Sequence, residues 1–261
     1  DVVLPEGYLA AVDEELRRLP ADAFGGPDAA HPSFTPVQKA ISYSMTSFFT
    51  TGGIRGGKKK LDKFYPRSFN MGIRRDVYQQ LEGFSAMRFG EDIDFSIRIF
   101  KGGYRCRLFP EAWVWHKRRT DFRKFFRQVY NSGIARINLY KKYPESLKLV
   151  HLLPMVFTVG VLFLLLLFIV GIVLGATVLR HCNQPFAGMI CGVALLPLVL
   201  YSLIIFVDAS RQYNSLWIGL LSIRAAFTQL MGYGFGFIEA WWKRCVRGKS
   251  EFSAFEKTFY K

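Results

Sequence analysis

The chain has 261 residues, and 35 Lys and Arg residues against 20 Asp and Glu residues give a formal net charge of +15. Such a charge suggests nucleic-acid binding, but the basic residues gather beside apolar segments and form no recognisable nucleic-acid motif. We therefore expect anionic membrane lipids, and no nucleic acid, as partners. The four cysteines show neither pairing nor metal-ligand spacing, which indicates a reducing compartment and excludes a zinc site.

Residues 1–150 are long enough to form a domain outside the membrane. Glu6–Leu19 has the apolar spacing of an amphipathic helix, and Pro36–Phe49 shows a second helical pattern. Between them, Phe24–Asp28 is a breaker cluster that ends in a carboxylate. Thr50–Lys60 is a loop rich in glycine and lysine, which either closes over a substrate phosphate or is simply mobile.

The middle of the chain alternates strand and helix patterns, as expected for part of an α/β layer. In order, the predicted elements are a strand at Pro66–Ile73, a helix at Arg75–Leu81, a turn at Glu82–Phe84, a helix from Glu91 to Phe100, and strands at Tyr104–Leu108 and Ala112–Trp115. His116 follows the last of these strands directly.

Residues 151–242 read as a membrane region. Leu152–Leu179 is uncharged and, at about 1.5 Å per helical residue, long enough to cross a hydrocarbon core of about 30 Å. Phe186–Val207 is a second candidate span. The polar segment Arg180–Pro185 is too short for anything but a tight turn, so we expect a transmembrane hairpin.

A third apolar stretch, Leu216–Ile238, is weaker because it carries Arg224 at its centre, where a charge costs about 3 kcal/mol on insertion scales. The alternating glycines of Gly232–Gly236 also lower its helix propensity. We interpret it as an interfacial or re-entrant segment, with a full third span as the alternative.

The distribution of Lys and Arg predicts the orientation in the membrane. Ten basic residues against two acidic ones lie between Lys117 and Lys148, directly before the first span, and the tail at residues 243–261 is also basic. Both ends should therefore face the cytoplasm. We expect a multi-pass protein of the cell (inner) membrane with a cytoplasmic catalytic part.

The carboxylates Glu91, Asp92 and Asp94 lie in the first turn of a predicted helix, where they favour the positive end of the helix dipole without any catalytic role. Carboxylates are also the groups that take a proton from a reacting hydroxyl. The residues around them decide between these interpretations.

Four motifs occur in an order and spacing that resemble a known family. They are Asn70-Met71-Gly72, the Gly83-Phe84 turn, Gly90-Glu91-Asp92-Ile93-Asp94, and Val114-Trp115-His116-Lys117-Arg118-Arg119. With the apolar segments that follow, the chain resembles the carboxyl-terminal part of a membrane-anchored family 2 glycosyltransferase of the GT-A fold. The resemblance implies a partial GT-A domain followed by the hairpin and a third membrane-associated helix.

The resemblance also implies roles for single residues. Asp92 would be the general base that deprotonates an acceptor hydroxyl, and Glu91 would position the acceptor. A Mg²⁺ or Mn²⁺ ion would neutralise the leaving diphosphate. Its ligands would be Asp1, as the last residue of an Asp-X-Asp motif, and His116, for which a structural role is the alternative. If Asp1 ends that motif, the nucleotide-binding half lies upstream and this fragment alone is inactive.

The remaining candidates would contact the donor or the acceptor. They are Asn70, Met71, Gly72, Asp94, Arg118, Arg119, Gln128 and Arg136. A basic amphipathic helix on lipid headgroups predicts the same cationic residues. The family's processive synthases carry Gln-X-X-Arg-Trp after the base, and Arg127–Arg136 departs from that pattern, which argues against a processive enzyme.

The predicted function is that of an inverting glycosyltransferase. It would move a sugar from a nucleotide-sugar donor to a lipid-linked or glycan acceptor at the cytoplasmic face, in cell-envelope glycan synthesis. One alternative is a polyprenyl-phosphate glycosyltransferase, whose acceptor is the phosphate itself. Another is a non-catalytic membrane module, if the chain truly begins at Asp1.

Overall fold

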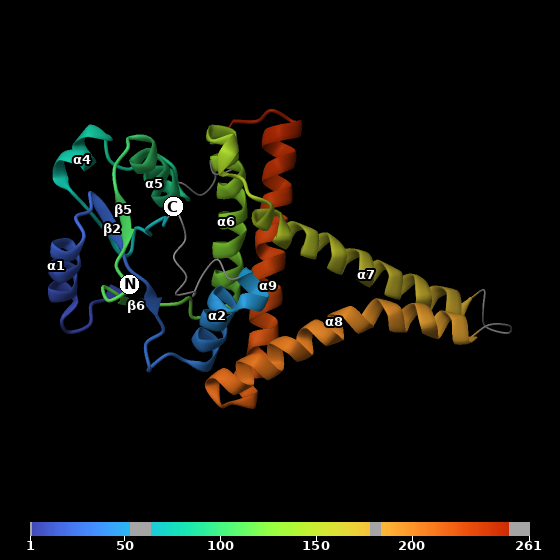
Figure 1. Ribbon diagram of the computed structural model, residues 1–261. Coiled ribbons are helices and arrows are strands. Elements are labelled where there is room, and N and C mark those ends of the chain that lie inside the picture. The colour runs from blue at the N-terminus through green and yellow to red at the C-terminus, as the bar shows by residue number, and fades with distance from the viewer. Residues whose placement is uncertain (1, 53–63, 178–183, 251–261) are drawn as a thin grey trace.

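The structure is a computed structural model that describes residues 2–52, 64–177 and 184–250 (Figure 1). Three sequence-based predictions fall wholly or mainly outside these residues: the metal ligand Asp1, most of the loop Thr50–Lys60, and most of the turn Arg180–Pro185. The last part of the basic tail, residues 251–261, also lies outside them.

Six short strands form two three-stranded sheets in the described part of the chain, which confirms a mixed α/β fold. One sheet has the order β1 (Val2–Val3), β6 (Val114–His116), β3 (Asp28–Ala29), and the other has the order β4 (Met71–Ile73), β2 (Ala23–Gly25), β5 (Cys106–Leu108). The chain passes from β2 directly into β3 through Gly26 and Pro27. Hydrogen bonds from Phe109 N to Gly25 O and from Val114 N to Pro27 O join the same two segments across this break (2.9 and 3.1 Å).

Three helices accompany the sheets: α1 (Tyr8–Arg18), α4 (Arg75–Gln80) and α5 (Glu91–Lys101). Phe95 and Ile99 of α5 are fully buried against Ala23 of β2. The predicted helices lie within a few residues of the observed ones. The predicted strand Pro66–Ile73 is shorter, because Pro66–Asn70 turns back on itself with Asn70 N bonded to Arg67 O at 2.9 Å.

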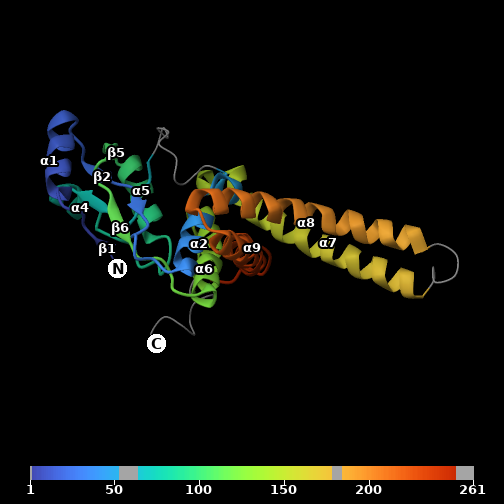
Figure 2. The ribbon, with the colours of Figure 1, turned by 90° about the horizontal axis from the view of Figure 1, so that it is seen from below.

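The second half of the fold is a helical layer. It contains α2 (Pro36–Thr46), α3 (Phe48–Thr51), α6 (Phe122–Lys142) and α9 (Leu216–Trp241), followed by a short π turn at Trp242–Val246. Figures 1 and 2 show α6 and α9 side by side with α2 against them. Ile41 of α2 packs on Phe125 of α6, and Ile137 of α6 packs on Phe237 of α9. The predicted helix Pro36–Phe49 is interrupted at Ser47, whose hydroxyl accepts from Phe49 N (3.3 Å) and begins α3.

Two helices project away from the rest of the molecule as an antiparallel pair (Figures 1 and 2): α7 (Leu153–Ala176), which follows short 3₁₀ turns at Pro144–Ser146 and Leu149–Leu152, and α8 (Gln184–Tyr213). Two segments, Leu149–Ala176 and Phe186–Tyr213, are long and apolar enough to cross a membrane. Only 17% and 11% of their most apolar windows is buried inside the protein, unlike the core helix of a soluble domain. Both segments overlap the predicted spans.

The glycine run in α9 does not break the helix, contrary to the low helix propensity expected there. A Cβ at Gly236 would overlap the carbonyl oxygen of Tyr130 on α6, and one at Gly234 would overlap the hydroxyl of Thr158 on α7. Conversely, a Cβ at Gly133 of α6 would overlap the carbonyl oxygen of Tyr233. The glycines therefore allow close helix crossings, and the packing gained there overrides their propensity.

Candidate active site

The first turn of α5 holds the acidic cluster. Gly90 caps the helix with a φ of 86°, a conformation that glycine adopts without strain. A Cβ at this position would meet the side chains of Ala135 and Leu139 on α6 at 3.4 and 3.3 Å. The start of α5 is thus fixed against α6, and the carboxylates behind Gly90 lie at the positive end of the helix.

Asp92 is mostly buried, with 13% of its side chain exposed. Its Oδ1 accepts a hydrogen bond from Ile93 N at 2.8 Å, and its Oδ2 lies 3.4 Å from Nη1 of Arg67. One oxygen is therefore oriented by the backbone, while the other is held near a cation by a longer contact. The carboxylate is therefore held in a fixed orientation at the start of α5.

Glu91 is half-buried beside it. Burial raises the pKa of Glu91, and the negative charge of Asp92 raises it further, while the positive charge of Arg67 lowers it. Arg67 therefore acts on the electrostatics of both carboxylates. A raised pKa next to a buried partner is typical of functional carboxylates, although ion-pair networks in structural positions produce shifts as well.

The turn at Arg67–Asn70 joins this cluster to the predicted histidine. Arg67 contacts Asp92 on one side, and on the other side the ring of Phe69 stacks on His116 with centroids 4.1 Å apart. The structure thus brings the proposed base and His116 to opposite sides of a single turn. Val2 of β1 pairs with His116 in the sheet.

The surroundings of His116 decide how well this site suits a metal. His116 Nδ1 lies 3.4 Å from Oδ2 of Asp28, and Nη1 of Arg118 lies 2.6 Å from the same oxygen and 3.4 Å from His116 Nδ1. A guanidinium thus occupies the position beside the two potential ligands. Across the described residues no three His, Cys, Asp or Glu side chains gather as a metal site. These residues alone do not fit a divalent cation, so we derive no step through one.

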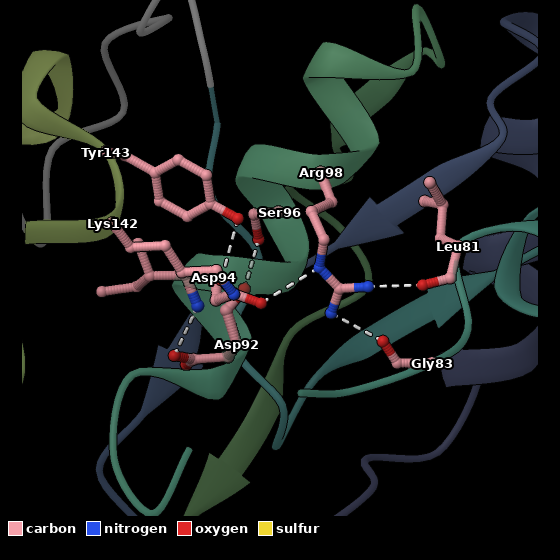
Figure 3. Close-up of polar contacts among 9 residues, drawn as sticks. Leu81, Gly83, Asp92, Asp94, Ser96, Arg98, Lys142 and Tyr143 are labelled. Carbon is pink, nitrogen blue, oxygen red and sulfur yellow. Dashed lines mark hydrogen bonds and ion pairs between the residues drawn. The ribbon is translucent and has the colours of Figure 1, made fainter. Parts of the chain in front are cut away.

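Asp94 is fully buried and serves as the centre of a polar network (Figure 3). Its carboxylate accepts from Nε of Arg98 at 3.0 Å, from Nζ of Lys142 at 2.6 Å and from the hydroxyl of Tyr143 at 3.0 Å. Burial by itself raises the pKa of Asp94, but the hydrogen bonds from Lys142 and Tyr143 outweigh burial and hold the pKa below its ordinary value.

Arg98 extends the network to the turn after α4, where its guanidinium donates to the carbonyl oxygens of Leu81 and Gly83 (Figure 3). Asp94 therefore connects α5 to the end of α6 and to the Gly83 turn. Its geometry favours a structural role over the predicted contact with donor or acceptor.

Asn70, Met71 and Gly72 also have structural partners. Asn70 is buried, accepts from the hydroxyl of Tyr8 at 2.7 Å and donates to the carbonyl oxygen of Ala112 at 2.8 Å. Met71 packs on the core beneath α5, and a Cβ at Gly72 would overlap the ring of Phe24. These contacts indicate a structural role for the motif.

Four residues of the basic region are predicted to contact the donor or the acceptor, and they lie in three separate places. Arg118 is buried and bonded to Asp28, while Arg119 and Gln128 bond each other at 3.1 Å on the surface. Nε of Arg136 is buried without a hydrogen-bond partner among the described residues. Within the residues that the structure describes, none of these four side chains forms a hydrogen bond or an ion pair with Glu91 or Asp92.

Sequence reasoning missed Arg67, Phe69 and Asp28 as members of the site. Arg67 and Phe69 fall within the predicted strand Pro66–Ile73, in which residues two positions apart point to the same face. The observed turn instead directs Arg67 to Asp92 and Phe69 to His116. The one available signal was Asp28, a carboxylate placed directly after the breaker residues Gly25-Gly26-Pro27.

Comparison with known proteins gives two matches. A family model described as glycosyl transferase family group 2 matches residues 67–223, which begin at Arg67 and include α5, β6, α6 and the hairpin. The probable glycosyltransferase YdaM of Bacillus subtilis (strain 168) is 32% identical over 59 residues, or 23% of this chain. The matched part spans only 14% of that relative's length.

Proposed function

The chain belongs to family group 2 of the glycosyl transferases, and from this premise we propose that it serves an inverting transfer of a sugar from a nucleotide-sugar donor to an acceptor hydroxyl. The observation that supports this proposal is the Glu91-Asp92 pair at the start of α5. Asp92 is mostly buried, its Oδ1 is anchored by Ile93 N, and its Oδ2 faces Arg67.

The chemistry requires a base on one side of the sugar and a leaving diphosphate on the other. A carboxylate within hydrogen-bond reach of the acceptor hydroxyl removes its proton as the oxygen attacks the anomeric carbon. Asp92 is the proposed base. Glu91, whose raised pKa follows from burial and from Asp92, is proposed to bind and orient the acceptor.

We place the reaction at the cytoplasmic face of the cell membrane. The segments Leu149–Ala176 and Phe186–Tyr213 are the proposed spans, and the basic region before them is the proposed contact with anionic lipids. A lipid-linked or glycan acceptor in envelope synthesis fits an active site attached to such a hairpin.

Dependence on Mg²⁺ or Mn²⁺ is a separate proposal that rests on the charge of the leaving diphosphate, and not on His116. Chelation with EDTA should abolish transfer by the native full-length protein, and added Mn²⁺ or Mg²⁺ should restore it. Full activity in excess chelator would exclude the cation.

The decisive experiment replaces Asp92 with Asn in the native full-length protein. Loss of a general base lowers turnover by about 10²- to 10⁴-fold. The matched control is Asp76→Asn, because Asp76 lies in the first turn of α4 but is half exposed and away from the site. Near-normal turnover of Asp92→Asn with a hydroxyl acceptor would refute the base assignment.

A further inference from the structure

The helix α9 lies across the base of the hairpin. The ring of Phe227 contacts both hairpin helices, with its centroid 5.5 Å from that of Phe157 on α7 and 5.7 Å from that of Tyr201 on α8. Beyond these contacts, the two helices extend about 26–29 Å at 1.5 Å per residue, to Ala176 and to Gln184. This length matches a hydrocarbon core of about 30 Å. If the hairpin spans the bilayer, the level of Phe227 therefore coincides with one boundary of the core.

α9 forms a layer between the hairpin and α6 (Figures 1 and 2). A Cβ at Gly234 would overlap the hydroxyl of Thr158 on α7, whereas one at Gly236 would overlap the carbonyl oxygen of Tyr130 on α6. Positions two apart on a helix are rotated by about 200° around its axis. The hairpin and α6 therefore pack on opposite sides of α9.

The charges on α6 argue against α9 as a third membrane span. α6 runs beside α9, because Phe122 lies 4.6 Å from the guanidinium carbon of Arg224 and Ile137 packs on Phe237. The exposed cations of α6 between these two contacts are Arg123, Lys124 and Arg127. If α9 crossed the bilayer, α6 would enter it as well, and each of these charges would cost about 3 kcal/mol. α9 therefore stays outside the hydrocarbon core.

One face of α9 is nonetheless apolar and open along its whole length. Its members recur at intervals of three, four or seven residues and are Trp217, Leu220, Phe227, Met231, Phe235 and Trp242. The four central residues line an open groove, and the two tryptophans at the ends are exposed. Tryptophan is enriched where a membrane meets water, and an amphipathic helix in that plane buries its apolar face in lipid.

α3 and the turn before α7 carry further exposed apolar side chains at the same level. The hydroxyl of Tyr201 donates to a carbonyl oxygen of α3 at 3.3 Å, and a Cβ at Gly52 would lie 3.7 Å from Val150 in that turn. Phe48 of α3 is 70% exposed, and Leu149 of the turn is 84% exposed. Exposed apolar side chains that gather on one surface mark a site of interaction. Since the apolar hairpin leaves the protein at this level, lipid is the partner that fits.

We propose that α9 lies in the plane of the cytoplasmic membrane interface, and that its face from Trp217 to Trp242, with Phe48 and Leu149, contacts the lipid around the hairpin. This inference rests on the membrane placement in the proposed function and assigns the bilayer contact of α9. α6 packs on α9, and α5 packs on α6. With helix axes 8–10 Å apart, the acidic pair of α5 would stand roughly 20 Å from the level of α9.

Depth measurements with spin labels on the full-length protein test the proposal. The four native cysteines are replaced by alanine, and single labels are attached to Leu220→Cys and Phe235→Cys on α9 and to Val156→Cys and Val170→Cys on α7. The protein is reconstituted in nanodiscs of phosphatidylglycerol and phosphatidylethanolamine. The depth of each label follows from its accessibility to oxygen and to a water-soluble nickel complex. Size-exclusion profiles that match the wild type would show that the variants fold.

The two α9 labels should report one common depth near the boundary between headgroups and acyl chains, as in a helix that lies in the interface. A spanning helix would instead separate Leu220→Cys from Phe235→Cys by about 22 Å, at 1.5 Å per residue. The matched control is the α7 pair. Val156→Cys and Val170→Cys should differ in depth by about 21 Å, because α7 is proposed to cross the bilayer.

Two results would overturn the proposal. A depth gradient along α9 would make it a third span, and α9 labels reached by the nickel complex but not by oxygen would place its face in water. In either case, a gradient along α7 would leave the proposed membrane placement intact. Equal depths at the two α7 positions would refute that placement, and the proposal with it. The Asp92→Asn experiment does not depend on any of these outcomes.

Discussion

The buried carboxylate of Asp94 gives the sharpest test of how the fold supports the site. Asn has the same shape as Asp but no charge, so Asp94→Asn removes the negative charge and replaces one of the two acceptor oxygens with an NH₂ donor, without creating a cavity. Removing one partner of a buried ion pair destabilises a protein by about 3–5 kcal/mol. Because 45% of the Lys142 side chain is exposed and Lys142 can turn to water, we expect the lower end, about 3 kcal/mol.

The assay is urea unfolding of the detergent-solubilised protein, followed by tryptophan fluorescence. Asp76→Asn, which removes a half-exposed carboxylate paired with Arg74, should leave the unfolding midpoint unchanged within error. A loss below about 1 kcal/mol for Asp94→Asn would refute the view that Asp94 holds α5 to α6.

The dependence on pH follows from the direction of the pKa shift. The pKa of Asp94 in the folded state lies below its ordinary value, so its carboxylate stabilises the fold above the unfolded pKa of about 3.9. This contribution is lost as the pH falls through the folded pKa. The difference in stability between the wild type and Asp94→Asn should therefore shrink below about pH 4.

Three further predictions concern the helix crossing and the acidic pair. Gly236→Ala should lower the free energy of unfolding by about 1–3 kcal/mol in the same urea assay, because the added Cβ would overlap a backbone carbonyl of α6. The control is Gly192→Ala on α8, where an added Cβ would have no atom within 4 Å, and it should cause no loss. Glu91→Gln should lower activity and move the acid limb of the pH–rate profile to lower pH, because it removes the carboxyl whose pKa is raised; an unmoved limb would show that Glu91 does not titrate in the reaction. Arg67→Gln should move the same limb to higher pH, because the positive charge of Arg67 lowers the pKa of Glu91; a shift to lower pH would contradict the geometry of the turn.

Local patterns in the sequence predicted the elements whose apolar spacing is regular. The helix at Glu91 was predicted nearly to its ends, because burial and helix periodicity coincide there. The two apolar segments were predicted from their length and hydropathy, although the second helix continues six residues past the predicted end at Val207. The first turn of α5 was predicted as an acidic cluster, and the family resemblance named Asp92 as the base, but nothing in the sequence indicated that Asp94 is the centre of a buried network. Their roles differ because Lys142 and Tyr143, nearly fifty residues later, return to Asp94 and leave Asp92 beside Arg67.

The parts that sequence did not predict depend on contacts between distant segments. The turn at Arg67–Asn70 forms because the Asn70 amide is bonded to Tyr8 and Ala112, which local propensity cannot anticipate. The glycine run in α9 predicts low helix propensity, and only its close contacts with α6 and α7 explain why the helix continues through it. In both cases, tertiary packing overrides a local preference.

The close crossing of α6 and α9 limits how far the candidate active site can move relative to the hairpin. Its glycines leave no room between the two helices, and α6 also contacts α5 through Leu139. The acidic cluster is therefore joined to the base of the hairpin by packed helices, and not by a flexible tether. If the hairpin spans the bilayer, the height of the candidate site above the lipid is fixed, so the proposed acceptor must present its hydroxyl at that height to be used.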